Sequence, residues 1–176
     1  MTRIARLFET LKRKRHCGMV AYLTAGDPSL AATEQFVLAL AEAGADVIEL
    51  GVPFSDPVAD GPVIQRASER ALRGGATLAG VLALVKSLRA KTEVPLVLFS
   101  YFNPVLQMGL EKFGDAAKTA GADGVLITDL TPEEAVDYRA AMSSRGLDTI
   151  FLAAPTSTDE RLALIAKSTS GFLYVI

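Results

Sequence analysis

The sequence contains one cysteine, one histidine and no tryptophan among its 176 residues. The single thiol of Cys17 excludes an internal disulfide, and together with the single imidazole of His16 it leaves no cysteine or histidine cluster for a metal site. The same scarcity disfavours a Ser-His-Asp enzyme. We therefore expect a reducing compartment, no metal and no thiol chemistry. Catalysis would have to come from carboxylates, lysine or arginine, tyrosine or backbone groups.

Long apolar runs and an excess of one charge are missing as well. The longest apolar stretches, such as residues 94–99, are far shorter than the roughly 20 residues of a membrane-spanning helix. No signal-peptide core is visible near the N-terminus. With 18 Lys+Arg against 20 Asp+Glu, the net charge of −2 argues against phosphate-driven nucleic-acid binding. The basic run 12–15 is interpreted as a solvated helix end. These features predict a cytoplasmic protein with neither a membrane nor a nucleic-acid partner.

What is present is an alternation of short apolar and longer amphipathic segments. Because half of the residues are hydrophobic, the chain can bury a core. The expected strands cover residues 18–24, 47–50, 96–101, 124–128, 148–153 and 172–176. The expected helices cover about 30–43, 62–72, 78–90, 111–120, 132–144 and 159–167, after an extra N-terminal helix with Ile4, Leu7, Phe8 and Leu11 on one face. Strands rich in Val, Ile and Leu that alternate with helices predict a parallel sheet in an α/β fold. No linker divides the chain, so residues 1–176 are expected to form a single domain.

Two parallel architectures fit this alternation, a doubly wound open sheet and a (β/α)8 barrel. No G-x-G-x-x-G follows the first strand and no P-loop motif occurs, which disfavours nucleotide-binding open sheets. Polar residues instead gather just after successive strands. They are Thr24, Asp27, Glu49, Ser55, Asp56, Asp60, Asn103, Asp129 and Thr156. Because a barrel builds its active site at the carboxyl ends of its strands, the pattern favours the barrel.

Glu49 is the most informative single residue. It lies within the strand 47–50, where Ile48 and Leu50 alternate with Val47 and Glu49, so that one pair is expected to face the helices and the other the barrel interior. A carboxyl group in that interior should have a raised pKa because burial disfavours its charged form. This is the setting of a general acid or base. The alternative is a structural carboxylate bonded to backbone N–H groups.

The loop that follows this strand, residues 51–61, is long for a strand-to-helix connection. Its prolines restrict its conformations, and its acidic residues can reach back over the strand ends. Asp60 is therefore a second candidate for the active site. The competing interpretation makes Asp60 the N-cap of the helix that begins at Pro62, and the local sequence leaves both open.

Taken together, these segments resemble the alpha chain of tryptophan synthase. The resemblance is carried by residues 22–28 (YLTAGDP), 44–65 (GADVIELGVPFSDPVADGPVIQ), 101–104 (YFNP), 121–124 (GADG), 129–130 (DL), 154–156 (APT) and 171–174 (GFLY). They run in order through the chain, and the block from Glu49 to Asp60 is close to a family signature.

The resemblance implies a (β/α)8 TIM barrel that cleaves indole-3-glycerol phosphate to indole and glyceraldehyde 3-phosphate without metal or organic cofactor. In the family, the residues matching Glu49 and Asp60 are the catalytic acid/base and its assistant. Positions lining the indole-glycerol pocket match Tyr22, Phe99, Tyr101, Leu126, Thr128, Leu152 and Tyr174, although each of these also fits ordinary barrel packing. Surfaces facing the beta subunit of an α2β2 complex match Pro53, Asp56, Asn103 and Pro104.

The sequence departs from the family pattern in two respects. Thr131 stands where the family usually has proline, which affects the local loop. The chain also ends within the expected sixth strand, whereas a barrel of this type needs about 250 residues and binds phosphate after strands seven and eight. From this we expect a partial barrel of about six strands that, taken alone, does not turn over the substrate and tends to associate through its open edges. Two alternatives stay open, a stand-alone lyase that never meets a beta subunit and a non-catalytic barrel fragment.

Overall fold

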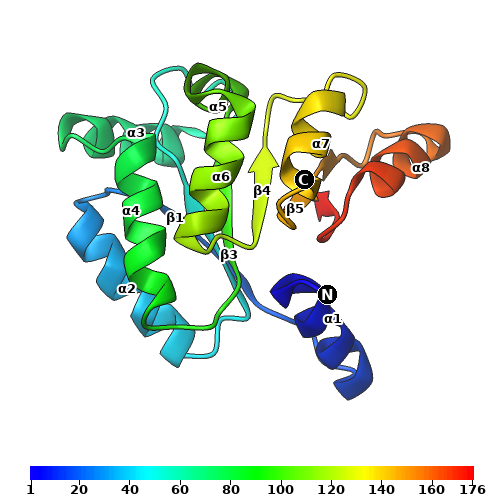
Figure 1. Cartoon of the computed structure of the whole chain (residues 1–176), viewed down its shortest axis with the longest axis horizontal. Helices are drawn as coiled ribbons and strands as arrows, with labels where there is room; N and C mark the ends of the chain where they lie inside the picture. The colour runs from blue at the N-terminus through cyan, green and yellow to red at the C-terminus, as the bar shows by residue number, and fades with distance from the viewer.

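Five parallel strands form the central sheet of the computed structural model, which describes all 176 residues (Figure 1). Their order is β1-β2-β3-β4-β5, so each strand pairs with the next one along the chain. Their bounds are β1 Val20–Thr24, β2 Val47–Gly51, β3 Leu96–Ser100, β4 Gly124–Ile127 and β5 Asp148–Ile150. A second, two-stranded parallel sheet pairs β6 Leu152–Ala153 with β7 Tyr174–Val175. This sequential parallel order is the one expected from the alternation of strands and helices.

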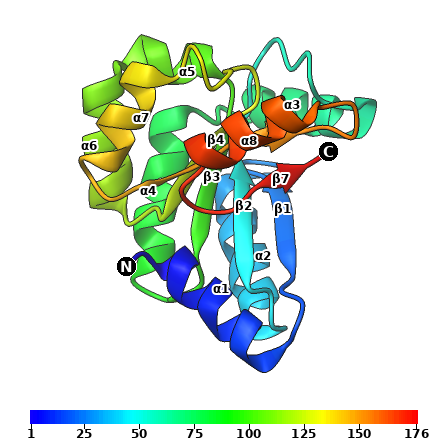
Figure 2. The ribbon, with the colours of Figure 1, turned by 90° about the vertical axis from the view of Figure 1, so that its right-hand side faces the viewer.

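Eight helices accompany the strands. They are α1 Arg3–Lys14, α2 Leu30–Glu42, α3 Pro62–Arg73, α4 Leu78–Arg89, α5 Phe102–Met108, α6 Leu110–Ala120, α7 Val136–Ser143 and α8 Asp159–Ser168. Helices α2, α4, α6 and α7 follow one another along one face of the sheet, and α1 lies across the ends at which the strands begin (Figures 1 and 2). None of the helices is by itself both long and apolar enough to cross a membrane. Helices α3 and α4 reach that length and apolar composition only when taken together, and the pair is bent by 93°.

The sheet separates two hydrophobic clusters, and the separation follows the alternation of side chains along β2. Ile48 and Leu50 belong to the larger cluster, which includes the buried residues of α4, α6 and α7. Val47 belongs to the smaller cluster on the opposite, inner face, where Ile4 of α1 is completely buried. The alternation predicted for this strand is therefore the one observed, and α1 closes the inner face at the beginning of the strands.

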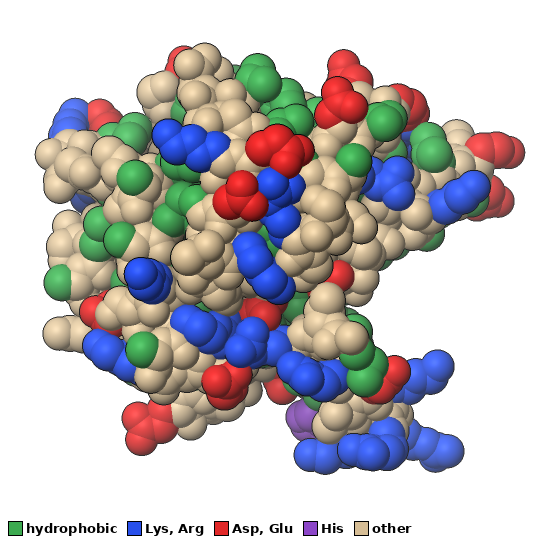
Figure 3. Space-filling model, viewed as in Figure 1, with side chains coloured by type: hydrophobic (Ala, Val, Ile, Leu, Met, Phe, Trp, Pro, Cys, Tyr) green, Lys and Arg blue, Asp and Glu red, His purple; other side chains and the backbone are tan.

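Helix α1 is held in this position by an ion-pair network beneath the sheet. Asp123, which is 5% exposed, accepts hydrogen bonds from Arg3 of α1 (3.1 Å) and Arg89 of α4 (2.7 Å). The backbone N–H of Leu96 donates a third bond to the same carboxylate (2.9 Å). The far end of α1 carries the basic run 12–15, whose side chains are exposed and gather at the tip of the helix, as expected of a solvated helix end (Figure 3).

Several expected element boundaries are wrong. For the strands, the difference is explained by which neighbouring strand each segment pairs with. The expected strand 148–153 is divided at Phe151, because β5 pairs with β4 whereas β6 pairs with β7. Of the expected strand 172–176, only Tyr174–Val175 is paired. These segments are strands only where a neighbour supplies hydrogen bonds, which the local sequence does not specify.

Two helices also differ from expectation. The expected helix 132–144 begins only at Val136, since Pro132 lies in a turn closed by the hydrogen bond from Glu134 N–H to the Thr131 carbonyl (3.2 Å). Helix α5 is absent from the expected elements, which pass from the strand 96–101 to the helix 111–120. Pro104 lies in the first turn of α5, where its missing N–H breaks no helical hydrogen bond.

Candidate active site

Glu49 lies in the middle of β2 and its side chain is almost completely buried, with 2% exposed. Its register partners are Tyr22 on β1 and Val97 on β3, and Val97 belongs to the inner cluster, so Glu49 also faces the inner side of the sheet. The carboxyl oxygen Oε1 is buried without a hydrogen-bond partner. Burial raises the pKa of Glu49 from its ordinary value of 4.5 to about 7. Oε1 is therefore not held by a backbone N–H, as the structural alternative considered above would require.

The ring of Tyr22 covers the strand end next to Glu49. A Cβ on Gly51 would lie 2.1 Å from the Tyr22 hydroxyl, so the absence of a side chain at Gly51 makes room for this ring. Burial raises the pKa of Tyr22 to about 12, with smaller contributions in the same direction from the nearby carboxylates of Asp60 and Glu49. Tyr22 is therefore a neutral hydroxyl at neutral pH, and it lies close to both acidic candidates.

Asp60 lies in the loop between β2 and α3 and is anchored by Tyr101. The Tyr101 hydroxyl donates to Asp60 Oδ2 (3.0 Å) and accepts a hydrogen bond from the Ala59 N–H (2.9 Å). Burial raises the pKa of Asp60, whereas the Tyr101 hydrogen bond partly lowers it. The N-cap residue of α3 is Gly61, and no side chain accepts a hydrogen bond from the first N–H groups of this helix. The interpretation of Asp60 as the N-cap is therefore wrong.

Aromatic and aliphatic side chains surround this space on the inner face. The Phe99 ring packs edge-on against Tyr22, with centroids 5.3 Å apart, and against Tyr174, with centroids 6.2 Å apart. Leu126 is fully buried in the inner cluster, and Leu152 packs against that cluster. Of the expected pocket residues, these five are thus brought together on one face of the sheet.

Thr128 and the expected partner-facing residues lie further toward the loops. The Thr128 hydroxyl donates to the Ser100 carbonyl (3.3 Å) beyond the end of β4. Pro53 is buried, whereas Asp56 is exposed and accepts a hydrogen bond from the Ser55 hydroxyl (2.5 Å). Asn103 and Pro104 both belong to the first turn of α5, where Asn103 is exposed and Pro104 is half-buried.

Two further features of the site are not evident from the sequence. Thr24 was noted only as a polar residue after the first strand, yet its hydroxyl is buried without a hydrogen-bond partner on the inner side of β1. The close approach of Tyr22 to Gly51 was not anticipated either. A glycine at the end of the strand was the available signal, because glycines in strands often mark close approach of another group.

The arrangement is suited to proton transfer. One carboxyl group, Glu49, has a pKa of about 7 and can both donate and accept a proton near neutrality. A second carboxyl group, Asp60, lies in the loop above, fixed by a tyrosine hydroxyl. No group of three or more His, Cys, Asp or Glu side chains is placed to hold a metal ion.

Comparison with known proteins identifies relatives along the whole chain. The profile of the family described as tryptophan synthase alpha chain matches residues 8–176. The chain is 57% identical to the tryptophan synthase alpha chain of Solibacter usitatus over 176 residues, which is all of this chain and 66% of that protein. It is 51% identical to the Geobacter sulfurreducens alpha chain, covering 67% of it. The chain thus spans about two thirds of the length of the curated relatives it matches.

Solved structures agree with the fold. Tryptophan synthase subunit alpha from Legionella pneumophila superimposes with a TM-score of 0.97 at 43% identity, covering all of this chain and 68% of that one. A subunit in the tryptophan synthase complex from Pyrococcus furiosus matches 90% of this chain and 65% of that one, with a TM-score of 0.87 at 44% identity. The fold is accordingly that of the (β/α)8 barrel, of which this chain covers a part, and the doubly wound alternative is wrong. The chain belongs to the tryptophan synthase alpha chain family.

Proposed function

We propose that this protein cleaves indole-3-glycerol phosphate to indole and glyceraldehyde 3-phosphate as the alpha subunit of tryptophan synthase. The observation that carries the proposal is the carboxyl group of Glu49, which is buried on the inner face with one oxygen unpartnered and its pKa raised to about 7. Family membership supports the same substrate and reaction.

In the proposed reaction, Glu49 delivers a proton and then receives one. Its protonated form donates to indole C3, which makes the ring nitrogen cationic. The resulting carboxylate takes the proton from the glycerol hydroxyl next to the ring, the carbon–carbon bond breaks, and its electron pair returns to the ring. Indole and the aldehyde leave, and Glu49 is again protonated. A group whose pKa lies near neutrality suits both halves of this cycle.

Asp60 has a different proposed role. Its carboxylate would accept a hydrogen bond from the indole N–H and so stabilise the positive charge that appears when C3 is protonated. The Tyr101 hydroxyl holds the Asp60 carboxylate in position above the strand ends, so less conformational entropy is lost when the carboxylate contacts the indole. The rings of Tyr22, Phe99 and Tyr174, with Leu126 and Leu152, would contact the indole.

The partner and setting are part of the same proposal. We propose that Asp56 and the first turn of α5, with Asn103 and Pro104, contact a beta subunit in a cytoplasmic α2β2 complex. The exposed side chains of Asp56 and Asn103 support this, as does the relative in the Pyrococcus furiosus tryptophan synthase complex. Measuring indole release with and without a beta subunit distinguishes the α2β2 hypothesis from a stand-alone lyase, because the rate should change on addition of the beta subunit only if the two subunits interact.

The main experiment measures indole release from indole-3-glycerol phosphate. It uses the 176-residue chain and an extended chain, defined as residues 1–176 followed by the C-terminal third of the Solibacter usitatus relative. Glu49→Gln preserves the shape of the side chain and should lower the rate of the extended chain by about 10²–10⁴-fold, since it abolishes proton transfer. Unchanged cleavage by this variant would refute the role of Glu49.

Asp60 needs two variants, because it is both charged and hydrogen-bonded. Asp60→Asn keeps an oxygen that can accept from Tyr101 but removes the charge, whereas Asp60→Ala removes both. We expect both variants of the extended chain to lose activity. If Asp60→Asn retains full activity and only Asp60→Ala is impaired, the residue anchors the loop and does not stabilise charge on the indole.

A further inference from the structure

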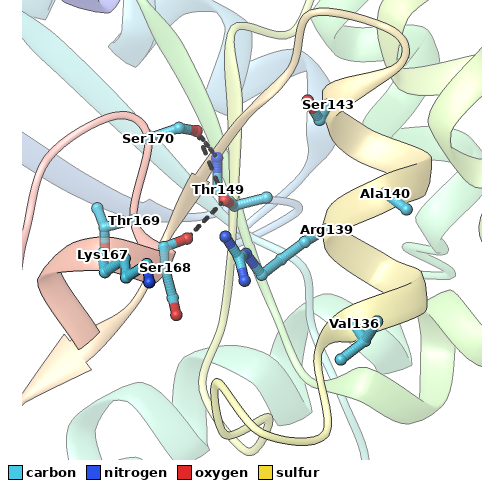
Figure 4. A pocket seen from close by; sticks show the side chains of 9 residues that line it. All are labelled: Val136, Arg139, Ala140, Ser143, Thr149, Lys167, Ser168, Thr169 and Ser170. Atoms are coloured by element: carbon cyan, nitrogen blue, oxygen red, sulfur yellow. Dashed lines mark hydrogen bonds between the residues drawn. The ribbon is translucent and has the colours of Figure 1, made fainter. Parts of the chain in front are cut away.

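A polar cleft of about 350 Å³ lies between α7 and α8, on the outer face of β5 (Figure 4). Thr149 of β5 lines the cleft, whereas its neighbour Ile150 belongs to the cluster on the inner face. Since successive side chains of a strand point to opposite faces, the sheet itself separates the cleft from Glu49. The cleft is therefore distinct from the proposed active site.

Arg139 of α7 distinguishes this cleft from the rest of the surface. Four other arginines are half-buried, and each bonds a carboxylate; they are Arg3, Arg89, Arg145 and Arg161. Arg139 is half-buried too, but it makes no ion pair and no side-chain hydrogen bond. Its guanidinium extends from α7 toward Thr149 and Ser168, into the space between the helices (Figure 4). It is thus a partly desolvated cation without a counter-charge.

A second cation and several hydroxyls share the cleft. Lys167, in the last turn of α8, also lacks an ion pair, and no aspartate or glutamate lines the cleft. Ser168 and Ser170 line the side of the cleft that carries Lys167, and Ser143 lines it further along α7, beyond Arg139 (Figure 4). The cleft thus carries two positive charges and no negative one.

The C-terminus of α8 could oppose an anion, because the last carbonyls of a helix carry partial negative charge. Two of these carbonyls are already occupied. The Thr149 hydroxyl donates to the Ser168 carbonyl (3.4 Å), and the hydroxyl and N–H of Thr169 donate to the Ile165 carbonyl (2.9 and 3.0 Å). Lys167 further offsets the helix dipole. The field inside the cleft is therefore set by the cations.

We propose that this cleft binds a phosphate group, either as inorganic phosphate or on a small phosphorylated molecule. The planar fork of Arg139 matches two phosphate oxygens, Lys167 supplies a point charge, and the serine hydroxyls donate to the remaining oxygens. A volume of about 350 Å³ lies at the small end of ligand pockets and suits a compact phosphate ester. The inference does not depend on the proposed function, since the cleft lies on the other side of the sheet.

The test is a titration of the ¹⁵N-labelled 176-residue chain with inorganic phosphate, followed by amide chemical shifts. We expect saturable shifts confined to residues 139–143 and 167–170, which weaken as sodium chloride is added. A parallel titration with glycerol 2-phosphate distinguishes the two sources, because tighter binding of the ester indicates a phosphorylated molecule rather than free phosphate. Absent shifts, or shifts spread evenly over the basic surface, would overturn the proposal.

Matched variants locate the effect. Arg139→Gln and Lys167→Gln should each weaken phosphate binding about tenfold or more, as expected when a charge-assisted hydrogen bond is lost. Arg66→Gln and Lys86→Gln remove the same charges from exposed positions outside the cleft, neither of which forms an ion pair, and should leave the affinity unchanged.

Ser143→Asp provides an independent check, because Ser143 is exposed and a carboxylate there should repel the anion without disturbing the core. Undiminished affinity in Ser143→Asp, or equal losses in the cleft and control variants, would contradict the assignment.

Discussion

The carboxyl group of Glu49 makes the stability of this protein depend on pH in a predictable direction. In the folded chain its pKa is about 7, whereas its ordinary value, which applies to the unfolded chain, is 4.5. Below both values the group is protonated in either state and has no effect. Between them the unfolded chain loses the proton first, so the free energy of unfolding falls as the pH rises. Above about 7 the full cost of burying the charge is present.

The size of this effect follows from the same two values. At about 1.4 kcal/mol per pKa unit, the rise from 4.5 to about 7 corresponds to about 3 kcal/mol. The side chain is 2% exposed, so little of this is screened by solvent. The glutamine in Glu49→Gln cannot ionise. We therefore expect its free energy of unfolding at pH 8 to exceed that of the wild type by about 3 kcal/mol, and the two proteins to match near pH 4.

The assay is urea unfolding followed by circular dichroism from pH 4 to 8, in the 176-residue chain and in the extended chain. The control is Glu42→Gln, which removes an exposed carboxylate at the end of α2 that makes no hydrogen bond. It should change the free energy of unfolding by less than about 0.5 kcal/mol at any pH. If Glu49→Gln and the wild type show the same pH dependence, Glu49 ionises as an ordinary surface carboxylate and the acid/base argument fails.

Three further substitutions test other contacts. Tyr101→Phe removes the hydrogen bonds that the hydroxyl forms with Asp60 and with the Ala59 N–H, and should cost about 1–2 kcal/mol in urea unfolding, with faster amide exchange at residue 59. Gly51→Ala should be destabilising in the wild type but much less so combined with Tyr22→Ala, and a double-mutant cycle without coupling would refute the steric argument. Asp123→Asn should cost about 3 kcal/mol by the same unfolding measurement, because it removes the counter-charge of Arg89 and one of the two carboxylates that Arg3 contacts.

Much of the fold was predictable because its signals are local. Four strands of the central sheet lie within the expected segments and β2 extends one residue beyond its own, to Gly51; the order of the strands follows from alternation with helices. The strands β6 and β7 were placed less well because each consists of two residues that pair only with each other. Helix α5 was missed because Asn103-Pro104 is equally consistent with a turn and with a first helical turn.

Only those features of the candidate site that depend on a single strand were predictable from the sequence. The alternation within β2 predicts on which face Glu49 lies, and this is observed. The position of the Tyr22 ring over Gly51 depends on the register between β1 and β2, which the sequence does not state. The role of Asp60 was left open because its partner, the hydroxyl of Tyr101, is 41 residues away in the sequence.

Two of the buried carboxylates of this chain, Asp123 and Glu49, show how a paired acid differs from an unpaired one. Asp123 is 5% exposed, and its carboxylate accepts bonds from Arg3, Arg89 and one backbone N–H, so its charge is compensated and α1 is fastened to the sheet. Glu49 is buried as deeply but has no such partner, and the cost appears as a raised pKa. Packing alone would be better served by an apolar residue, because an unpartnered polar group is expensive to bury. Its place on β2, beside Tyr22 and beneath the loop of Asp60, fits the proton transfer that we propose for it.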